Sequence, residues 1–196
     1  LVPVDLEKVD SAPDVAPEIV AVGKRINRKH EQPPDVRHTV THSDGDVAAC
    51  LCATPNPIAG ARCLHVGDMS YQPLASPSYA ARFFPEGPSA EAFQKAPAIV
   101  FGPHDQLQHQ FLAQCGYQGH FPYHLCPSSE GFVRLATAGI GYGMIPQRQA
   151  AEQLQAGQLV SIAPGQGLTV PLYWHYWRHS GQLIQRLTER LSHLTL

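Results

Sequence analysis

The stretch Ala98-Ile-Val-Phe-Gly-Pro-His-Asp-Gln-Leu-Gln-His-Gln-Phe-Leu112 indicates how this chain folds. Its first four residues form a short apolar run that is typical of a buried strand, and Gly102-Pro103 turns the chain. Leu107, Phe111 and Leu112 then recur at helical spacing. The stretch therefore predicts a strand, a turn and a helix in succession, which is one repeat of an α/β fold.

The same alternation continues on both sides of this stretch, and it is typical of an α/β fold with mainly parallel strands. Apolar runs between turn signals predict strands over 47–53, 71–75, 98–101, 123–126, 139–146, 159–162 and 170–177. Helical patterns fall over 78–84, 90–95, 105–115, 132–138, 147–155 and 181–196. In the last of these helices we expect a buried stripe formed by Leu183, Ile184, Leu187, Leu191 and Leu194.

Composition excludes several classes of protein. The 196 residues are 43% hydrophobic with a net charge of -2, so the chain as given offers no basic surface for nucleic acid. No apolar run is long enough to span a membrane, and the opening residues do not resemble a signal peptide. The chain has five cysteines, an odd number. Together with the lack of a signal-peptide pattern, this count predicts a cytoplasmic protein with reduced, mostly buried thiols.

Charge is concentrated in residues 1–46, which hold half of the charged residues and five prolines. Little apolar periodicity is present there, except for a candidate short strand or helical turn over residues 18–22. We interpret 1–46 as an anomalous or disordered segment, and a genuine disordered linker would look the same. The regular pattern occupies residues 47–196.

Three loops are candidate binding elements, because open α/β sheets bind ligands beyond the carboxyl ends of their strands. They cover residues 54–57, 102–105 and 127–130. Ser128 or Ser129 can begin a helix with Glu130 near its positive end, where amide groups attract a carboxylate; ordinary capping explains the same residues. Asp105 can pair with a cationic group of a ligand or, equally, cap the next helix.

Metal and catalytic signals are weak. Eleven histidines are present, but His120 and His124 flank Pro122, and no acid or cysteine completes a site near His175 and His179. No G-x-S-x-G motif and no close pair of carboxylates occurs. We therefore expect no cofactor, no metal and no catalysis.

From Gly45 onward, ordered motifs resemble the effector-binding region of a LysR-type transcriptional regulator, most closely the subgroup that responds to arginine and lysine. The resemblance covers about 150 residues, and it is the order of the motifs, rather than any one of them, that is specific. The motifs are Gly45-Asp-Val-Ala-Ala-Cys50, Ala75-Ser-Pro-Ser-Tyr-Ala80, Arg82-Phe-Phe-Pro85, Lys95-Ala-Pro-Ala-Ile-Val-Phe101, Pro127-Ser-Ser-Glu-Gly-Phe-Val133, Gly143-Met-Ile-Pro146, Leu154-x-x-Gly-x-Leu159 and Pro171-Leu-Tyr-Trp174.

This resemblance implies a two-lobed α/β fold like a type II periplasmic binding protein. One lobe would cover about residues 72–163, and the other about 47–71 plus 164–196. A basic amino acid, lysine or arginine, would bind between the lobes and control transcription. The resemblance implies that the ligand-binding residues are Thr54, Phe101, His104, Asp105, Ser128, Ser129 and Glu130.

The chain departs from the family pattern in two respects. The amino-terminal winged helix-turn-helix is missing, so we expect DNA contact only through that absent domain, and residues 1–46 do not resemble the family's first strand and helix. We therefore expect a partly truncated effector domain that forms a homo-oligomer without membrane contact. The alternatives are a free-standing solute-binding protein and a small α/β hydrolase or transferase.

Overall fold

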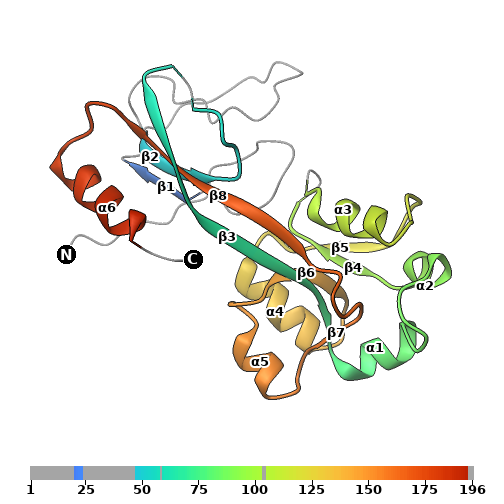
Figure 1. Cartoon of the computed structure of the whole chain (residues 1–196). Helices are drawn as coiled ribbons and strands as arrows, with labels where there is room; N and C mark the ends of the chain where they lie inside the picture. The colour runs from blue at the N-terminus through green and yellow to red at the C-terminus, as the bar shows by residue number, and fades with distance from the viewer. Residues whose placement is uncertain (1–19, 24–46, 58, 103–104, 194–196) are drawn as a thin grey trace. The chain divides into compact units, whose positions relative to one another are not determined.

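The structure, a computed structural model, describes residues 20–23, 47–57, 59–102 and 105–193 (Figure 1). The chain divides into two compact units. Unit 1 contains the described residues of Leu1–Asp68 and Val170–Leu196, and unit 2 is Met69–Thr169. Two strands, β3 (Ala61–Ala75) and β8 (Leu168–Trp177), run from one unit into the other.

Unit 2 is built on β4 (Ala98–Val100), which lies between β5 (Tyr123–Leu125) and β6 (Tyr142–Pro146) and pairs in parallel with both. The end of β3 pairs antiparallel with β6 and with β7 (Val160–Ser161). All three residues of β4 are buried, as are the first four of β6, because helices cover both faces of these strands.

One face of these strands packs against α4 (Ser129–Thr137). Ile99 and Ile145 meet Phe132, Val133 and Ala136 of that helix in one apolar cluster. Successive residues of a strand point to opposite faces of the sheet. On the face away from α4, the ring of Tyr142 contacts the rings of Phe84 and Phe93. Figure 1 shows α3 (Leu107–Gln114) and α4 on opposite sides of these strands.

Short helices close unit 2. Ser76 accepts a hydrogen bond at the start of α1 (Pro77–Phe83), and Ser89 does the same for α2 (Ala90–Lys95). The remaining helix is α5 (Ala151–Gln155), which begins four residues later than the predicted span 147–155 because Gln147 to Ala150 form turns. The predicted start and end of α2 agree with the structure.

In the residues that the structure describes, unit 1 is an antiparallel sheet with one helix. Its strand order is β1 (Val20–Gly23), β2 (Val47–Cys52), β8 and β3. The helix α6 (Gln182–Ser192) is anchored to β8 by the indole Nε1 of Trp174, which donates to Thr188 Oγ1 at 2.8 Å. Strand β1 overlaps the element expected over residues 18–22.

The expected predominance of parallel strands is wrong. Strand β4 is parallel to β5 and β6, whereas β1 with β2, β2 with β8, and β3 with β6 and β7 are antiparallel. The prediction failed because β3 and β8 are long strands that pass between the units rather than members of strand–helix–strand repeats. The predicted alternation of strands and helices is present, but the direction of the strands depends on how β3 and β8 run.

Two further local expectations need correction. Strand β3 begins ten residues before the predicted Tyr71, because exposed polar residues such as Arg62 and Asp68 interrupt its apolar pattern. In α6, Leu183 is 76% exposed, and Ile184 is the only buried one of the four predicted stripe residues that the structure describes. Leu187 and Leu191 are half-buried, and Leu194 lies outside the described residues.

Most of the predicted anomalous segment, residues 1–46, also lies outside the described residues, which include only 20–23 of it. Among the helices that the structure describes, none has both the length and the apolar character needed to cross a bilayer. All five cysteines are free thiols; Cys50 and Cys52 are buried, while Cys63, Cys115 and Cys126 are half-buried.

Candidate functional site

Strands β4 and β5 end side by side, so the loops that follow them begin at one edge of unit 2. Val100 pairs with Leu125 in parallel register. The backbone amide of Cys126 then donates to the carbonyl oxygen of Val100 at 2.9 Å. The loop that carries Phe101 and Asp105 therefore lies beside the loop that leads to Ser128, which brings two of the three predicted loops together.

Both carboxylate oxygens of Asp105 are bonded to the backbone. Oδ2 accepts from the amide of Phe101 at 3.1 Å, and Oδ1 accepts from the amide of Leu107 at 3.0 Å. The residue is 8% exposed, and this burial raises the pKa of Asp105 above its ordinary value, although the two amides and His109 act in the opposite direction. Asp105 therefore closes the turn between β4 and α3, which is the structural role that the sequence left open.

Ser128 begins α4. Its Oγ accepts from the amide of Gly131 at 3.1 Å, so of the two candidate serines it is Ser128 that caps the helix. Ser129 is the first helical residue and is half-buried. Glu130 is exposed, and its Oε1 accepts from Arg134 at 2.6 Å, one helical turn later. The i,i+4 spacing of Glu130 and Arg134 was visible in the sequence as a signal for this pair.

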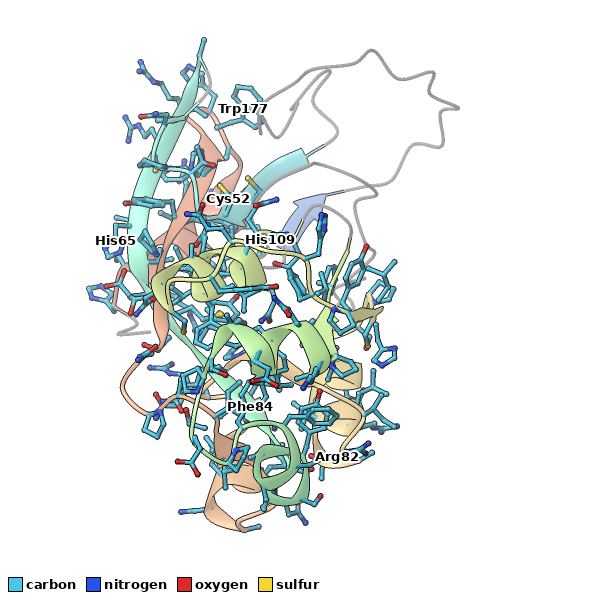
Figure 2. All side chains as sticks on the ribbon, turned by 90° about the vertical axis from the view of Figure 1, so that its right-hand side faces the viewer. Cys52, His65, Arg82, Phe84, His109 and Trp177 are labelled. Carbon is cyan, nitrogen blue, oxygen red and sulfur yellow. The ribbon has the colours of Figure 1, made fainter. Side chains whose placement is uncertain are left out.

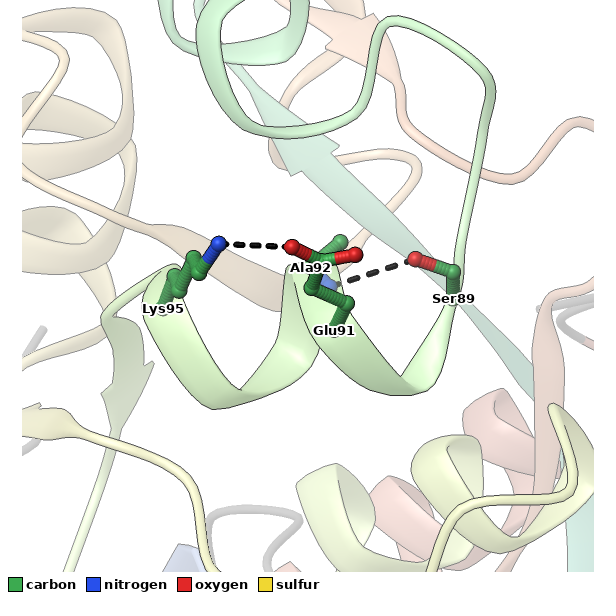
Figure 3. Close-up of polar contacts among 4 residues, drawn as sticks. All are labelled: Ser89, Glu91, Ala92 and Lys95. Carbon is green, nitrogen blue, oxygen red and sulfur yellow. Dashed lines mark hydrogen bonds and ion pairs between the residues drawn. The ribbon is translucent and has the colours of Figure 1, made fainter.

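Helix α2 repeats this arrangement at a place where no site is predicted. Ser89 Oγ accepts from the amide of Ala92 at 3.2 Å, and Lys95 donates to Glu91 at 2.7 Å (Figure 3). In both helices a serine cap is followed two residues later by glutamate and six residues later by a base. The cap and the ion pair therefore also occur at a helix start with no predicted site, and α2 supplies a matched control for α4.

Phe101 and His104 complete the predicted set in unit 2. Phe101 is half-buried, and its ring centroid lies 6.4 Å from that of Phe132 on α4. This contact joins the loop after β4 to the helix that Ser128 begins. His104 lies outside the described residues.

Thr54 belongs to unit 1, just after β2. Its carbonyl oxygen lies 2.7 Å from Nε2 of the buried His175 on β8 and 3.8 Å from Sγ of Cys52. Since a carbonyl oxygen only accepts, His175 carries a proton on Nε2. Thr54 stays a predicted ligand-binding residue, and in the structure its backbone carbonyl anchors the loop after β2.

Sequence reasoning missed the environment of His175. Cys63 Sγ lies 3.5 Å from His175 Nε2, and Cys50 is the residue paired with His175 across β2 and β8. Alternation along the strands carried part of this signal, but the register between strands far apart in sequence did not. Within the described ranges, no group of three or more His, Cys, Asp or Glu residues is arranged to hold a metal ion.

Comparison with known proteins agrees with this fold. The family profile described as LysR substrate binding domain matches residues 24–195. The regulator ArgP of Pseudomonas aeruginosa is 55% identical over 147 residues, which are 75% of this chain and 49% of ArgP. The chain spans about half the length of the curated relatives that it matches.

Two solved structures are similar as well. The C-terminal domains of a LysR family protein from Agrobacterium tumefaciens superpose with a TM-score of 0.72 at 36% identity, covering 76% of this chain and 72% of that one. Full-length LysG from Corynebacterium glutamicum, with bound effector Arg, superposes with a TM-score of 0.67 at 31% identity. The match covers 76% of this chain and 51% of LysG.

These matches confirm the resemblance carried by the ordered motifs, and with it the two-lobed α/β fold of LysR regulatory domains. The profile covers far more than half of the residues. This chain therefore belongs to the LysR substrate-binding domain family.

Proposed function

We propose that this chain is the effector-sensing domain of a LysR-type regulator of transcription and that its effector is a basic amino acid, lysine or arginine. The observation that carries the proposal is the 55% identity with ArgP of Pseudomonas aeruginosa. LysG, solved with bound effector Arg, supports the choice of a basic amino acid.

The start of α4 is suited to an amino acid's carboxylate. A helix amino terminus carries partial positive charge and amide donors, which favour an anion. Ser128 orients this terminus, and Phe101 offers an apolar surface beside it. Ser129 and Glu130 lie in the same turn. We assign the carboxylate of the effector to this turn.

The cationic end of the effector needs an acid. Glu130 is the accessible candidate, because its ion pair with Arg134 is exposed and readily exchanged. Asp105 is the second candidate, and a ligand cation would have to share its oxygens with the Phe101 and Leu107 amides. Thr54 and His104 complete the proposed set of ligand-binding residues.

For the whole regulator we propose DNA binding through a helix-turn-helix, assembly as a homo-oligomer and a cytoplasmic location. Relatives named as transcriptional regulators support a role without catalysis. Binding of the effector would favour one conformation of the domain and so change the geometry of the regulator on DNA.

Calorimetry tests the proposal. We expect L-arginine or L-lysine to bind the 196-residue chain saturably, and neutral L-citrulline to bind about 10- to 100-fold more weakly because it lacks the charge-assisted contact. Ligand recovered unchanged by NMR supports a sensor. Equal affinity for citrulline would overturn the choice of a basic effector, and consumption of ligand would overturn the non-catalytic role.

A further inference from the structure

Two buried polar side chains of unit 2, Gln108 and Tyr142, end in atoms that have no hydrogen-bond partner among the described residues. Gln108 on α3 is 1% exposed, and Tyr142 on β6 is 0% exposed. Both amide atoms of Gln108 and the hydroxyl of Tyr142 are unpartnered, which makes three of the four such atoms in the part of the chain that the structure describes. Native proteins leave few groups in this state, because burial removes the hydrogen bonds that these groups make to water in the unfolded chain.

The two side chains are neighbours across the contact between α3 and β6. Phe111 follows Gln108 by one helical turn and shares its face of α3. The ring centroid of Phe111 lies 5.9 Å from that of Phe93, which in turn lies 6.2 Å from that of Tyr142. Burial raises the pKa of Tyr142, and the nearby Gln108 amide opposes this shift. The unpartnered atoms therefore belong to one small polar spot within an aromatic core.

The other polar side chains around Tyr142 are already engaged. The hydroxyl groups of Tyr79 and Tyr117 donate to backbone carbonyl oxygens at 2.7 and 2.6 Å. The Cys115 thiol donates to a side-chain carbonyl oxygen at 3.1 Å. Each of these groups has spent its one proton on a partner elsewhere. The missing hydrogen bonds of Gln108 and Tyr142 must therefore come from each other or from a small molecule between them.

A direct contact between the two side chains would not satisfy all three atoms. Nε2 of Gln108 only donates and Oε1 only accepts, and the two atoms lie at opposite ends of the amide. A Tyr142 hydroxyl that meets one of them leaves the other buried and unpaired. One water molecule closes the set, because it donates and accepts at once. Nε2 then donates to the hydroxyl oxygen, the hydroxyl donates to the water, and the water donates to Oε1.

We propose that unit 2 binds one internal water molecule between α3 and β6, held by the Tyr142 hydroxyl and the Gln108 amide. Buried waters characteristically bond to polar groups that the protein itself leaves unsatisfied. The surroundings exclude a larger ligand: the ring of Phe84, labelled in Figure 2, lies 5.3 Å from that of Tyr142, edge to face, and Phe93 packs beside it. Gln108 follows Asp105 by three residues, so the water ties the start of α3, and with it the loop that Asp105 closes, to β6.

A crystal structure of the 196-residue chain, at a resolution that shows ordered waters, tests the proposal directly. We expect one isolated peak of electron density within hydrogen-bond distance of Tyr142 Oη and of a Gln108 amide atom. In Tyr142→Phe this peak should disappear, because the water loses one of its two side-chain partners. A direct contact between Tyr142 Oη and the Gln108 amide in the wild type, with no density peak beside it, would overturn the proposal.

Thermal denaturation of a double-mutant cycle tests whether the two side chains share the site. Tyr142→Phe and Gln108→Leu should each lower the midpoint by about 2–8 °C, because each leaves a buried polar group short of a partner. Together they should lower it by clearly less than the sum, since no polar group then stays buried. In the control cycle, Tyr79→Phe and Gln108→Leu should add, because the Tyr79 hydroxyl is bonded to the Pro97 carbonyl.

Additive losses for Tyr142→Phe and Gln108→Leu would overturn the shared site. If either variant fails to fold, the density in the wild-type crystal decides alone. Effector affinity is not involved in any of these measurements, so their failure would leave the proposed function intact.

Discussion

Asp105 accepts a hydrogen bond from the backbone amide of Phe101, four residues before it, at 3.1 Å, and this bond holds the loop after β4 against the start of α3. The other oxygen accepts from Leu107 at 3.0 Å. A carboxylate that was expected to meet a ligand is thus first of all a structural acceptor, and any effect of its removal on effector binding has to be separated from its effect on folding.

Asp105→Ala should destabilise the chain by about 2–4 kcal/mol, because two buried amides lose their acceptors at about 1–3 kcal/mol each and partly relax. Chemical denaturation measures the change, with Glu152→Ala on the exposed part of α5 as the control. If Asp105 also meets the effector, affinity at a temperature where both variants are folded should fall by about 1.5–3 kcal/mol. Unchanged affinity would remove Asp105 from the binding site.

Asp105→Asn should reveal the sign of the pKa shift. Because burial raises the pKa of Asp105 in the folded chain, its protonated form favours folding: the contribution is complete below the ordinary value of 3.8 and is lost as pH rises through the folded pKa. The stability difference between wild type and Asp105→Asn should therefore shift against the wild type as pH rises. A difference that moves the other way would show that the two amides outweigh burial.

Ser128→Ala should cost about 1 kcal/mol, since the amide of Gly131 loses its cap. Ser89→Ala removes the corresponding cap from α2 and should cost a similar amount. Only Ser128→Ala should also weaken effector binding, measured by calorimetry. Equal effects of the two variants on affinity would show that capping, and not recognition, explains the serine at position 128.

Gly131→Ala should distort the start of α4. A Cβ there would lie 2.6 Å from Sγ of Cys126, so the loop must move, and overpacking of this kind costs about 1–3 kcal/mol. In a Cys126→Ala background the sulfur is gone, and the greater helix propensity of alanine should offset much of that cost. A double-mutant cycle by thermal denaturation checks the coupling; additive effects would contradict the contact.

The Cys52 thiol should lose its proton at a lower pH than an ordinary thiol does, because its pKa is lowered to about 6. Its alkylation rate by iodoacetamide should rise through about pH 6 and then level off, whereas a thiol with the value 9.0 would rise throughout the neutral range. The groups that face it are Cys50, Cys63 and His175. Because the folded pKa is lowered, this thiolate contributes stability that is lost as pH falls through about 6. Cys50→Ser should move the midpoint upward, and an unmoved midpoint would show that Cys50 does not lower the pKa of Cys52.

Local sequence determined the serine caps of α2 and α4, the family and the positions of the loops. Ser89 and Ser128 cap their helices because a serine side chain reaches the amide three residues later, a contact contained within one turn. The apolar run from Ala98 to Val100 was recognisable as a buried strand for the same reason, since burial on both faces requires only apolar neighbours along the chain.

Tertiary structure decided what local pattern cannot encode. Strand direction depended on β3 and β8 crossing between units, so the expected parallel sheet became a mixed one. Cys63 Sγ lies 3.5 Å from His175 Nε2, and Cys50 pairs with His175 across two strands, although these segments are more than one hundred residues apart in sequence. Asp105 binds the backbone amides of Phe101 and Leu107 because the loop folds back on itself. Register and burial are set by contacts between distant segments, which no single stretch of sequence contains.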